Sequence, residues 1–249
     1  MVIDAITFGG EVDMLEGRMH ELMPHIDYMV IIESNRTYTN RPKVYQFLEH
    51  FDRFQPFEDK FLYQPIEGLG SNDAWANDYH QRRSVGTFLS KMGLDEDDVV
   101  FLSDTDEWFD PALIPQVENL VYAIRLKKLH MSLHWFHKWE TCGIAAKWGN
   151  LKGKDVDSLR WQRGTMPTLE GGWHLTSMGS HEYLVNKINS FAHQELNWAG
   201  VESELLDCWT NGHDLAGDWF TEIDIDATFP QWVKDRKAPA DWYRRRHGR

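Results

Sequence analysis

Strand-like and helix-like segments alternate along the first 110 residues of this 249-residue chain, and this alternation constrains the fold most strongly. Short apolar runs typical of buried strands cover residues 4–10, 27–34, 60–66 and 96–104. Between them, residues 11–24 and 74–94 space their apolar side chains as helices do. Such alternation predicts an α/β fold with a Rossmann-like, mixed but mostly parallel sheet flanked by helices.

The second half of the chain has a different pattern. Residues 129–139, "LHMSLHWFHKW", form a mixed apolar and aromatic run that predicts a strand, and residues 181–191 and 201–212 predict two helices. We find neither an internal repeat nor a low-complexity linker. We therefore expect a single domain over residues 1–249, in which residues 1–110 bind a ligand and residues 111–249 complete the other side of a cleft.

The composition limits the classes of partner. A net charge of −13 argues against a general nucleic-acid surface, because phosphate binding depends on clustered Lys and Arg. The tail "WYRRRHGR" is a local exception, either a solvated end or a contact for an anionic partner such as DNA, through Arg244, Arg245, Arg246 and Arg249. The 12 tryptophans suit either a core or a groove for flat rings.

Cysteine content and hydropathy indicate the compartment. Cys142 and Cys208 stand among aromatic residues and are too few for a disulfide framework, so we expect both in the core. No run approaches the roughly 18 apolar residues of a membrane span, and the first residues lack the basic region of a signal peptide. We expect a soluble, cytoplasmic protein with no membrane partner.

The stretch "VVFLSDTDEW" places carboxylates directly after the fourth predicted strand. Ligands of such sheets bind at the carboxyl ends of the strands, where Asp104 and Asp106 stand. Two neighbouring carboxylates repel unless a cation neutralises them, and hard oxygen ligands suit Mg²⁺ or Mn²⁺. The pattern predicts a site for a metal ion and a diphosphate, although an acidic turn would read the same.

Other motifs are weaker. His130, His134 and His137 would gather a zinc ion on a helix, but their aromatic neighbours favour a strand, with the histidines packed or exposed. Arg82 and Arg83 on the predicted helix could bind phosphate or lie on a surface face. We find no dinucleotide-binding glycine motif, phosphate-binding P-loop or nucleophile elbow.

Several segments together resemble glycosyltransferase family 17, which includes bisecting β-1,4-N-acetylglucosaminyltransferases. The resemblance runs from about Ile6 to Trp242 and rests on "EVDMLEGRMHEL", "IDYMVIIESNRTYT", "DDVVFLSDTDEWFDP", "LHMSLHWFHKW", "GGWHLTSMG" and "NKINSFAHQE". It implies a GT-A fold with residues 1–110 as the nucleotide-sugar-binding half. It also implies inverting transfer of a GlcNAc-like sugar from a UDP-sugar donor to a hydroxyl acceptor, with Mn²⁺ or Mg²⁺.

The resemblance also implies roles for individual residues. Asp104, Asp106 and His174 would hold the metal ion, and Asp106 would also take part in catalysis. Donor contacts would come from four further side chains, besides Asp104: Glu33, Arg82, Arg83 and Trp173. Glu195 is the expected base for the acceptor hydroxyl, and His193 is an alternative metal ligand.

Vertebrate members carry a membrane anchor and a stem, and we expect this chain to have neither, which suggests a bacterial or viral setting. The acceptor then stays open among a glycan, a protein and DNA, as does the oligomeric state. Two other functions compete with sugar transfer. The carboxylate pair would also serve a metal-dependent nucleotidyltransferase or phosphoesterase, and the tryptophans would serve a non-catalytic carbohydrate-binding protein.

Overall fold

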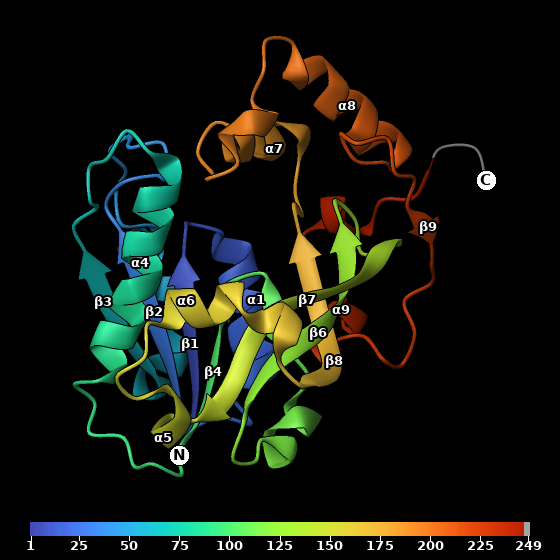
Figure 1. Ribbon diagram of the computed structural model, residues 1–249. Coiled ribbons are helices and arrows are strands. Elements are labelled where there is room, and N and C mark those ends of the chain that lie inside the picture. Colours follow the sequence, from blue (N-terminus) through green and yellow to red (C-terminus); the bar gives the residue numbers. More distant parts are fainter. Residues whose placement is uncertain (247–249) are drawn as a thin grey trace.

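The computed structural model describes residues 1–246, which form one nine-stranded sheet with helices on both faces (Figure 1). The strand order is β3-β2-β1-β4-β7-β6-β8-β5, and β9 pairs with β7. The strands are β1 (Val2–Phe8), β2 (Tyr28–Ser34), β3 (Phe61–Ile66), β4 (Val99–Asp104), β5 (Glu107–Phe109), β6 (Val121–His130), β7 (Trp135–Lys147), β8 (Thr168–Thr176) and β9 (Thr221–Glu222). One sheet therefore runs through both halves of the chain.

The first four strands confirm the predicted α/β class. β1 lies between β2 and β4 and is parallel to both, and β3 is parallel to β2, so these carboxyl ends share one edge. Beyond β4 the sheet is mixed: β7 is antiparallel to β4 and β6, whereas β8 is parallel to β6. The parallel part matches the segments whose apolar runs predict strands buried on both faces.

Two layers of helices cover the sheet. The longer helices are α1 (Val12–Leu22), α4 (Ala74–Leu89), α6 (Val156–Trp161), α7 (His181–Ile188) and α8 (Val201–Asn211). The four-residue helices are α2 (Gln46–Glu49), α3 (Phe51–Phe54), α5 (Trp148–Leu151) and α9 (Gln231–Lys234). Short 3-10 turns are η1 (Gln55–Lys60), η2 (Pro111–Gln116), η3 (Arg163–Thr165), η4 (Gln194–Leu196) and η5 (Ala240–Tyr243).

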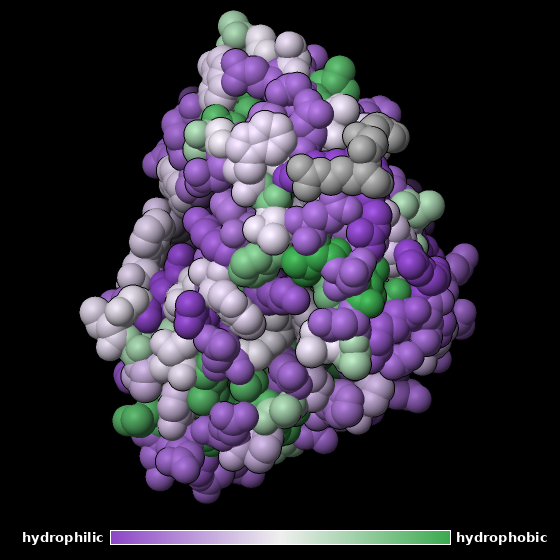
Figure 2. Space-filling model, turned by 90° about the vertical axis from the view of Figure 1, so that its right-hand side faces the viewer, coloured by the Kyte–Doolittle hydropathy of each residue, from purple (hydrophilic) through white to green (hydrophobic). Residues whose placement is uncertain are grey.

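Strand alternation assigns each helix layer its own core. On one face α1 packs with Ile6 and Phe8 of β1, and on the other α4 and α6 pack with Ile3 and Ala5. α7 and α8 lie beyond the carboxyl ends of the parallel strands (Figure 1). The side of the molecule seen in Figure 2 is largely hydrophilic, with small apolar patches. No helix within residues 1–246 is long and apolar enough to cross a bilayer.

The run at 129–139 is a hairpin and not the single strand that its composition predicts. β6 ends at His130, and Met131 has a φ of 63°, which turns the chain before β7 begins at Trp135. The Ser132 hydroxyl fixes this turn by donating to the carbonyl of Arg244 at 2.6 Å. A contact with a segment over a hundred residues away therefore overrides the local pattern.

The arginines of the tail bind the fold itself. The guanidinium of Arg244 lies 3.7 Å from the ring centroid of Trp209, and that of Arg246 donates to the carbonyl of Gly212 at 3.0 Å. Arg245 pairs with Glu222 at 3.0 Å. Arg244 and Arg246 are thus held against the fold and are not a solvated end, whereas the contact with an anionic partner such as DNA stays a prediction. Arg249 lies outside the described residues.

A buried arginine connects α1 to the turn after β4. Arg18 has no solvent-exposed surface and binds both oxygens of Asp4, at 2.7 and 2.8 Å. Its guanidinium also donates to the carbonyls of Asp104 and Glu107, at 2.9 and 2.6 Å, and to the Ser103 hydroxyl at 2.7 Å. With the Thr105 carbonyl at 3.3 Å, six acceptors satisfy one buried charge, which fixes the path of the chain after β4.

We expect Arg18→Met to lower the free energy of unfolding by about 3–5 kcal/mol, because it leaves the Asp4 carboxylate buried without a partner. Urea denaturation followed by circular dichroism measures the change. Arg53→Met is the matched control. Arg53 is half-exposed where it pairs with Asp13 and Glu16, so its loss should cost less than about 1 kcal/mol. Equal losses for both variants would contradict this assignment.

Candidate functional site

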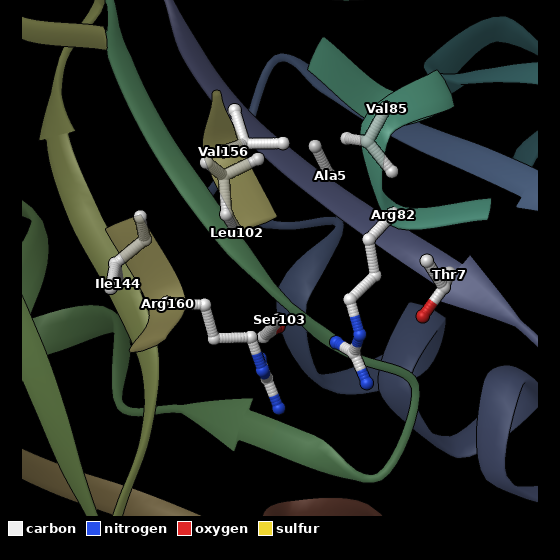
Figure 3. A pocket seen from close by; sticks show the side chains of 9 residues that line it. All are labelled: Ala5, Thr7, Arg82, Val85, Leu102, Ser103, Ile144, Val156 and Arg160. Carbon is white, nitrogen blue, oxygen red and sulfur yellow. The ribbon is translucent and has the colours of Figure 1, made fainter. Parts of the chain in front are cut away.

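A cavity of about 630 Å³ opens at the carboxyl ends of the parallel strands. Its walls come from α4, α6, β6, β7, β8 and α7, and from the loop that follows α8. A smaller pocket of about 30 Å³ lies beside it, between Val85 and Leu102, where Arg82 and Arg160 approach each other (Figure 3). The location agrees with the expectation that ligands of such sheets bind at the strand ends.

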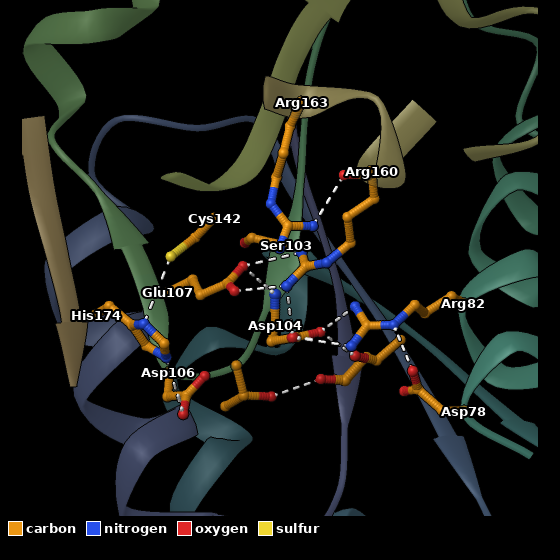
Figure 4. Close-up of polar contacts among 12 residues, drawn as sticks. Asp78, Arg82, Ser103, Asp104, Asp106, Glu107, Cys142, Arg160, Arg163 and His174 are labelled. Atoms are coloured by element: carbon orange, nitrogen blue, oxygen red, sulfur yellow. Dashed lines mark hydrogen bonds and ion pairs between the residues drawn. The ribbon is translucent and has the colours of Figure 1, made fainter. Parts of the chain in front are cut away.

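Asp104 holds two arginines that face the cavity (Figure 4). Arg82 binds it with two nitrogens, at 2.6 and 3.0 Å, and Arg160 binds at 2.7 Å. The Thr7 hydroxyl donates to the same carboxylate at 2.9 Å. Burial opposes the charged form, but the two guanidinium groups outweigh it and hold the pKa of Asp104 well below its usual range. Asp104 is therefore an ionised, fully engaged acceptor.

Each arginine has a second carboxylate that fixes its direction. Asp78, one turn earlier on α4, accepts from Arg82 Nε at 3.0 Å. Glu107 of β5 accepts from Arg160 at 3.0 Å. Planar guanidinium groups held at both ends lose little freedom when an anion binds, so this pair is preorganised for phosphate oxygens.

Asp106 has looser contacts on the other side of the cavity. Its carboxylate lies 3.7 Å from His174 Nε2 and 3.6 Å from Lys187 Nζ. Burial would raise the pKa of Asp106, but the charges of His174 and Lys187 outweigh it and lower the pKa to about 2. Glu140 accepts from His174 Nδ1 at 2.8 Å, and the Cys142 sulfur lies 3.4 Å from that nitrogen. Burial also raises the pKa of the Cys142 thiol to about 11.

The two aspartates differ as ligands for a divalent ion. Four hydrogen bonds already occupy the oxygens of Asp104, so its surroundings do not fit a metal ion. Asp106 has no such bonds, and His174 turns Nε2 toward it while Nδ1 faces Glu140. Metal-binding histidines commonly pair their other nitrogen with a carboxylate in this way. Asp106 and His174 are therefore the predicted ligands that fit an ion. Burial opposes the charged form of His174, but Cys142 and Asp106 outweigh it and hold its pKa well above its usual value, so a bound ion would displace the proton that they favour.

Four other predicted residues do not line the cavity. Glu33 is buried and paired with Lys43 at 2.6 Å, and Arg83 pairs with Asp155 on the surface at 3.2 Å. Trp173 packs in the core. The Glu195 side chain is 61% exposed and pairs with His193, which does line the cavity. These positions argue against the predicted donor and base roles of the four.

The sequence analysis allowed a groove for flat rings but did not name the residues that form the aromatic wall of the cavity. Trp75 and Tyr79 project from successive turns of α4, and Trp161 of α6 lies 6.2 Å from the Trp75 ring. Trp161 is 61% exposed, so its ring face is accessible to a ligand in the cavity. The helical spacing of Trp75, Tyr79 and Arg82 is the signal that could have revealed this wall.

The structure also shows where the three histidines of the possible zinc site lie. His134 stands in the hairpin turn, and its ring lies 2.8 Å from the carbonyl of Ile223. His130 and His137 lie on the same side of the sheet with their rings stacked at 5.8 Å. The three histidines therefore do not converge on one zinc ion.

Comparison with known proteins identifies the lineage of the first part of the chain. The model of the family described as Glycosyltransferase family 17 matches residues 1–148. Rat and human proteins named beta-1,4-mannosyl-glycoprotein 4-beta-N-acetylglucosaminyltransferase are each 33% identical over 117 residues. That alignment covers 43% of this chain and 21% of each relative, so the chain matches only about a fifth of their length.

Solved structures are more distant. The inositol-1-phosphate CTP transferase of T. maritima aligns with a TM-score of 0.39 and 14% identity, over 76% of this chain and 95% of that one. The glycosyltransferase GlyE of Streptococcus pneumoniae TIGR4 aligns with a TM-score of 0.33 and 12% identity, over 83% and 42%. Similarity at this level adds nothing to the assignment of function.

We expect Asp104→Asn and Asp106→Asn to differ in stability without any metal. Asp104→Asn removes the charge between two arginines and should lower the free energy of unfolding by about 1–3 kcal/mol. Asp106→Asn loses only contacts longer than 3.5 Å and should cost less than Asp104→Asn does. Urea denaturation in EDTA measures both. Equal stability of the two variants would show that Asp104 does not support the arginines.

Proposed function

Because the chain belongs to glycosyltransferase family 17, we propose that this cavity transfers a GlcNAc-like sugar from a UDP-sugar to an acceptor hydroxyl, with inversion. The observation that supports it most directly is the group of cations around Asp104 and Asp106. Arg82, Arg160 and Lys187 face one cavity at the carboxyl ends of the strands. A diphosphate is the anion that such a group suits, since guanidinium groups match phosphate oxygens in charge and geometry.

The proposal includes a divalent ion, Mn²⁺ or Mg²⁺, held by Asp106 and His174. When bound, the ion supplies positive charge to the departing diphosphate. Glu140 keeps His174 oriented through Nδ1, and Lys187 adds a fixed positive charge beside Asp106. In this proposal Asp104 positions Arg82 and Arg160, and Asp106 and not Asp104 binds the ion.

The aromatic wall supports a ligand that contains flat or ring-shaped groups. Trp75, Tyr79 and Trp161 provide ring faces within the same cavity as the two arginines. Sugar and base rings pack against such faces. Polar and aromatic groups together in one concave site fit a nucleotide sugar better than they fit a phosphate monoester alone.

An inverting transfer requires a base beside the acceptor hydroxyl. Seven carboxylates line the cavity. Five of them have a cationic or histidine partner: Asp78, Asp104, Asp106, Glu107 and Glu140. Asp214 also lines it and faces His137. Asp157 is the remaining carboxylate, and its side chain has no hydrogen-bond partner in the described chain. Burial raises its pKa, which brings it closer to that of an effective base.

We therefore assign the role of base for the acceptor hydroxyl to Asp157 in place of Glu195. We expect Asp157→Asn to lower kcat by about 10²–10⁴-fold with little change in donor KM, since only the proton acceptor is lost. Glu195→Gln is the control and should retain full turnover, because Glu195 lies outside the cavity. Steady-state kinetics with saturating acceptor measures both. A large loss of kcat in Glu195→Gln, together with a normal kcat in Asp157→Asn, would assign the role of base to Glu195.

The function itself is tested by incubating the protein with UDP-, GDP- and CMP-sugars, with Mn²⁺ or EDTA, and assaying free nucleotide. We expect UDP release from UDP-GlcNAc only with metal. Asp106→Asn should lower kcat/KM by about 10²–10³-fold, as the loss of one electrostatic group at a reaction centre does. Release of pyrophosphate would favour a nucleotidyltransferase. Sugar binding without turnover, unchanged in Asp106→Asn, would favour a carbohydrate-binding protein.

A further inference from the structure

A second cluster of metal-binding side chains lies where the loop after α8 meets β7. His137 of β7 directs Nε2 at Asp214, whose carboxylate oxygen is 3.5 Å away, and at Asp218, at 3.9 Å. One ligand atom from each residue lies within 4.8 Å of the other two. None of the three belongs to the group around Asp106 and His174.

His137 lacks the hydrogen bonds that a buried imidazole needs. Its side chain is only 9% exposed, and its Nδ1 is buried with no partner. Both distances from Nε2 to the carboxylates exceed the usual hydrogen-bond range. Nε2, the atom that faces the two aspartates, therefore has no hydrogen bond within residues 1–246 either, and the gap between it and the carboxylates suits a ligand.

The distances suit a shared ion. Two atoms that each lie about 2.1 Å from a metal are roughly 3.0–4.2 Å apart, depending on the angle between them. The separations of 3.5 and 3.9 Å fall inside that range. We propose that His137, Asp214 and Asp218 bind a divalent transition metal ion of the Zn²⁺ type. One imidazole with two carboxylates favours such an ion over Mg²⁺ or Ca²⁺, which prefer oxygen ligands alone.

The turn that carries the two aspartates is already shaped for this role. Asp214 Oδ1 accepts from the backbone nitrogens of Ala216 and Asp218, at 3.0 and 2.9 Å. The other oxygen, Oδ2, is the one that faces His137. A bound ion would therefore connect this turn to β7 without breaking its internal bonds.

The site would stabilise one wall of the large cavity. Asp214, Leu215 and Ala216 line that cavity, so an ion on Asp214 would fix the wall opposite the parallel strands. This role is structural and does not depend on the proposed transfer. Because Nδ1 of His137 has no outer partner, we expect affinity about 10–100-fold weaker than in sites with one.

The test measures metal content and needs no enzymatic assay. The full-length protein is stripped with a chelator, dialysed against Zn²⁺ and analysed by elemental mass spectrometry. We expect Asp214→Asn, Asp218→Asn and His137→Gln each to lose one ion per chain relative to the wild type. Asp224→Asn is the control, because Asp224 is an exposed carboxylate that pairs with Arg245, and should lose none.

A parallel variant separates this site from the proposed catalytic one. His174→Ala should keep the ion at His137, and its melting temperature should rise by roughly 5–10 °C when Zn²⁺ is a hundredfold above the dissociation constant. Mg²⁺ should give no such rise. Equal zinc content in the wild type and Asp218→Asn, or loss of all zinc in His174→Ala, would overturn the proposal whatever the activity.

Discussion

The buried guanidinium of Arg18 is the interaction on which the site depends. It holds the carbonyls of Asp104 and Glu107 toward the interior, and the Thr105 hydroxyl turns inward to the carbonyl of Thr7 at 2.7 Å. With those groups held inside, the three acidic side chains of the turn face the cavity. The turn thus owes its shape to a helix 86 residues earlier in the sequence.

The balance of charge around that turn explains how a chain of net charge −13 can receive an anion. Asp104 neutralises part of the charge of Arg82 and Arg160, which keeps two guanidinium groups close together at one end of the cavity. Without that carboxylate, mutual repulsion and desolvation would drive the arginines apart. Net charge describes the whole surface and says little about such a local arrangement.

Local pattern was sufficient for the parallel half of the fold and insufficient for the site. The apolar runs correctly predicted β1, β2 and β4, because strands buried on both faces need continuous apolar sequence. They also predicted β3, which is a partly buried strand at the edge of the sheet. Glu33 and Asp104 each stand at the carboxyl end of such a strand. Glu33 is buried and pairs with Lys43, whereas Asp104 lines the cavity. That difference depends on which distant segment packs nearby, and the local sequence does not encode it.

Packing of distant segments also determines the partners of the acidic turn, so the local sequence did not predict them. Arg160 reaches Asp104 only because β7 inserts between β4 and β6, which brings α6 over the strand ends. His174 meets Asp106 through the antiparallel pairing of β5 with β8. Both contacts follow from strand order, which a reading of periodicity does not provide. The sequence pattern also did not distinguish core tryptophans from exposed ones: Trp173 is buried in the core, whereas Trp161 is exposed.

The boundary of the family match has a consequence for specificity. Residues 1–148 contain β1 to β7 with Arg82, Asp104 and Asp106, whereas Arg160, His174 and Lys187 lie beyond it. The cavity is thus lined both by residues within the family match and by residues beyond it. Under the proposed transfer, the matched groups near the acidic turn would contact the donor. The wall formed by α7, α8 and the loop at Asp214 lies beyond the match, so the match carries no argument about the acceptor.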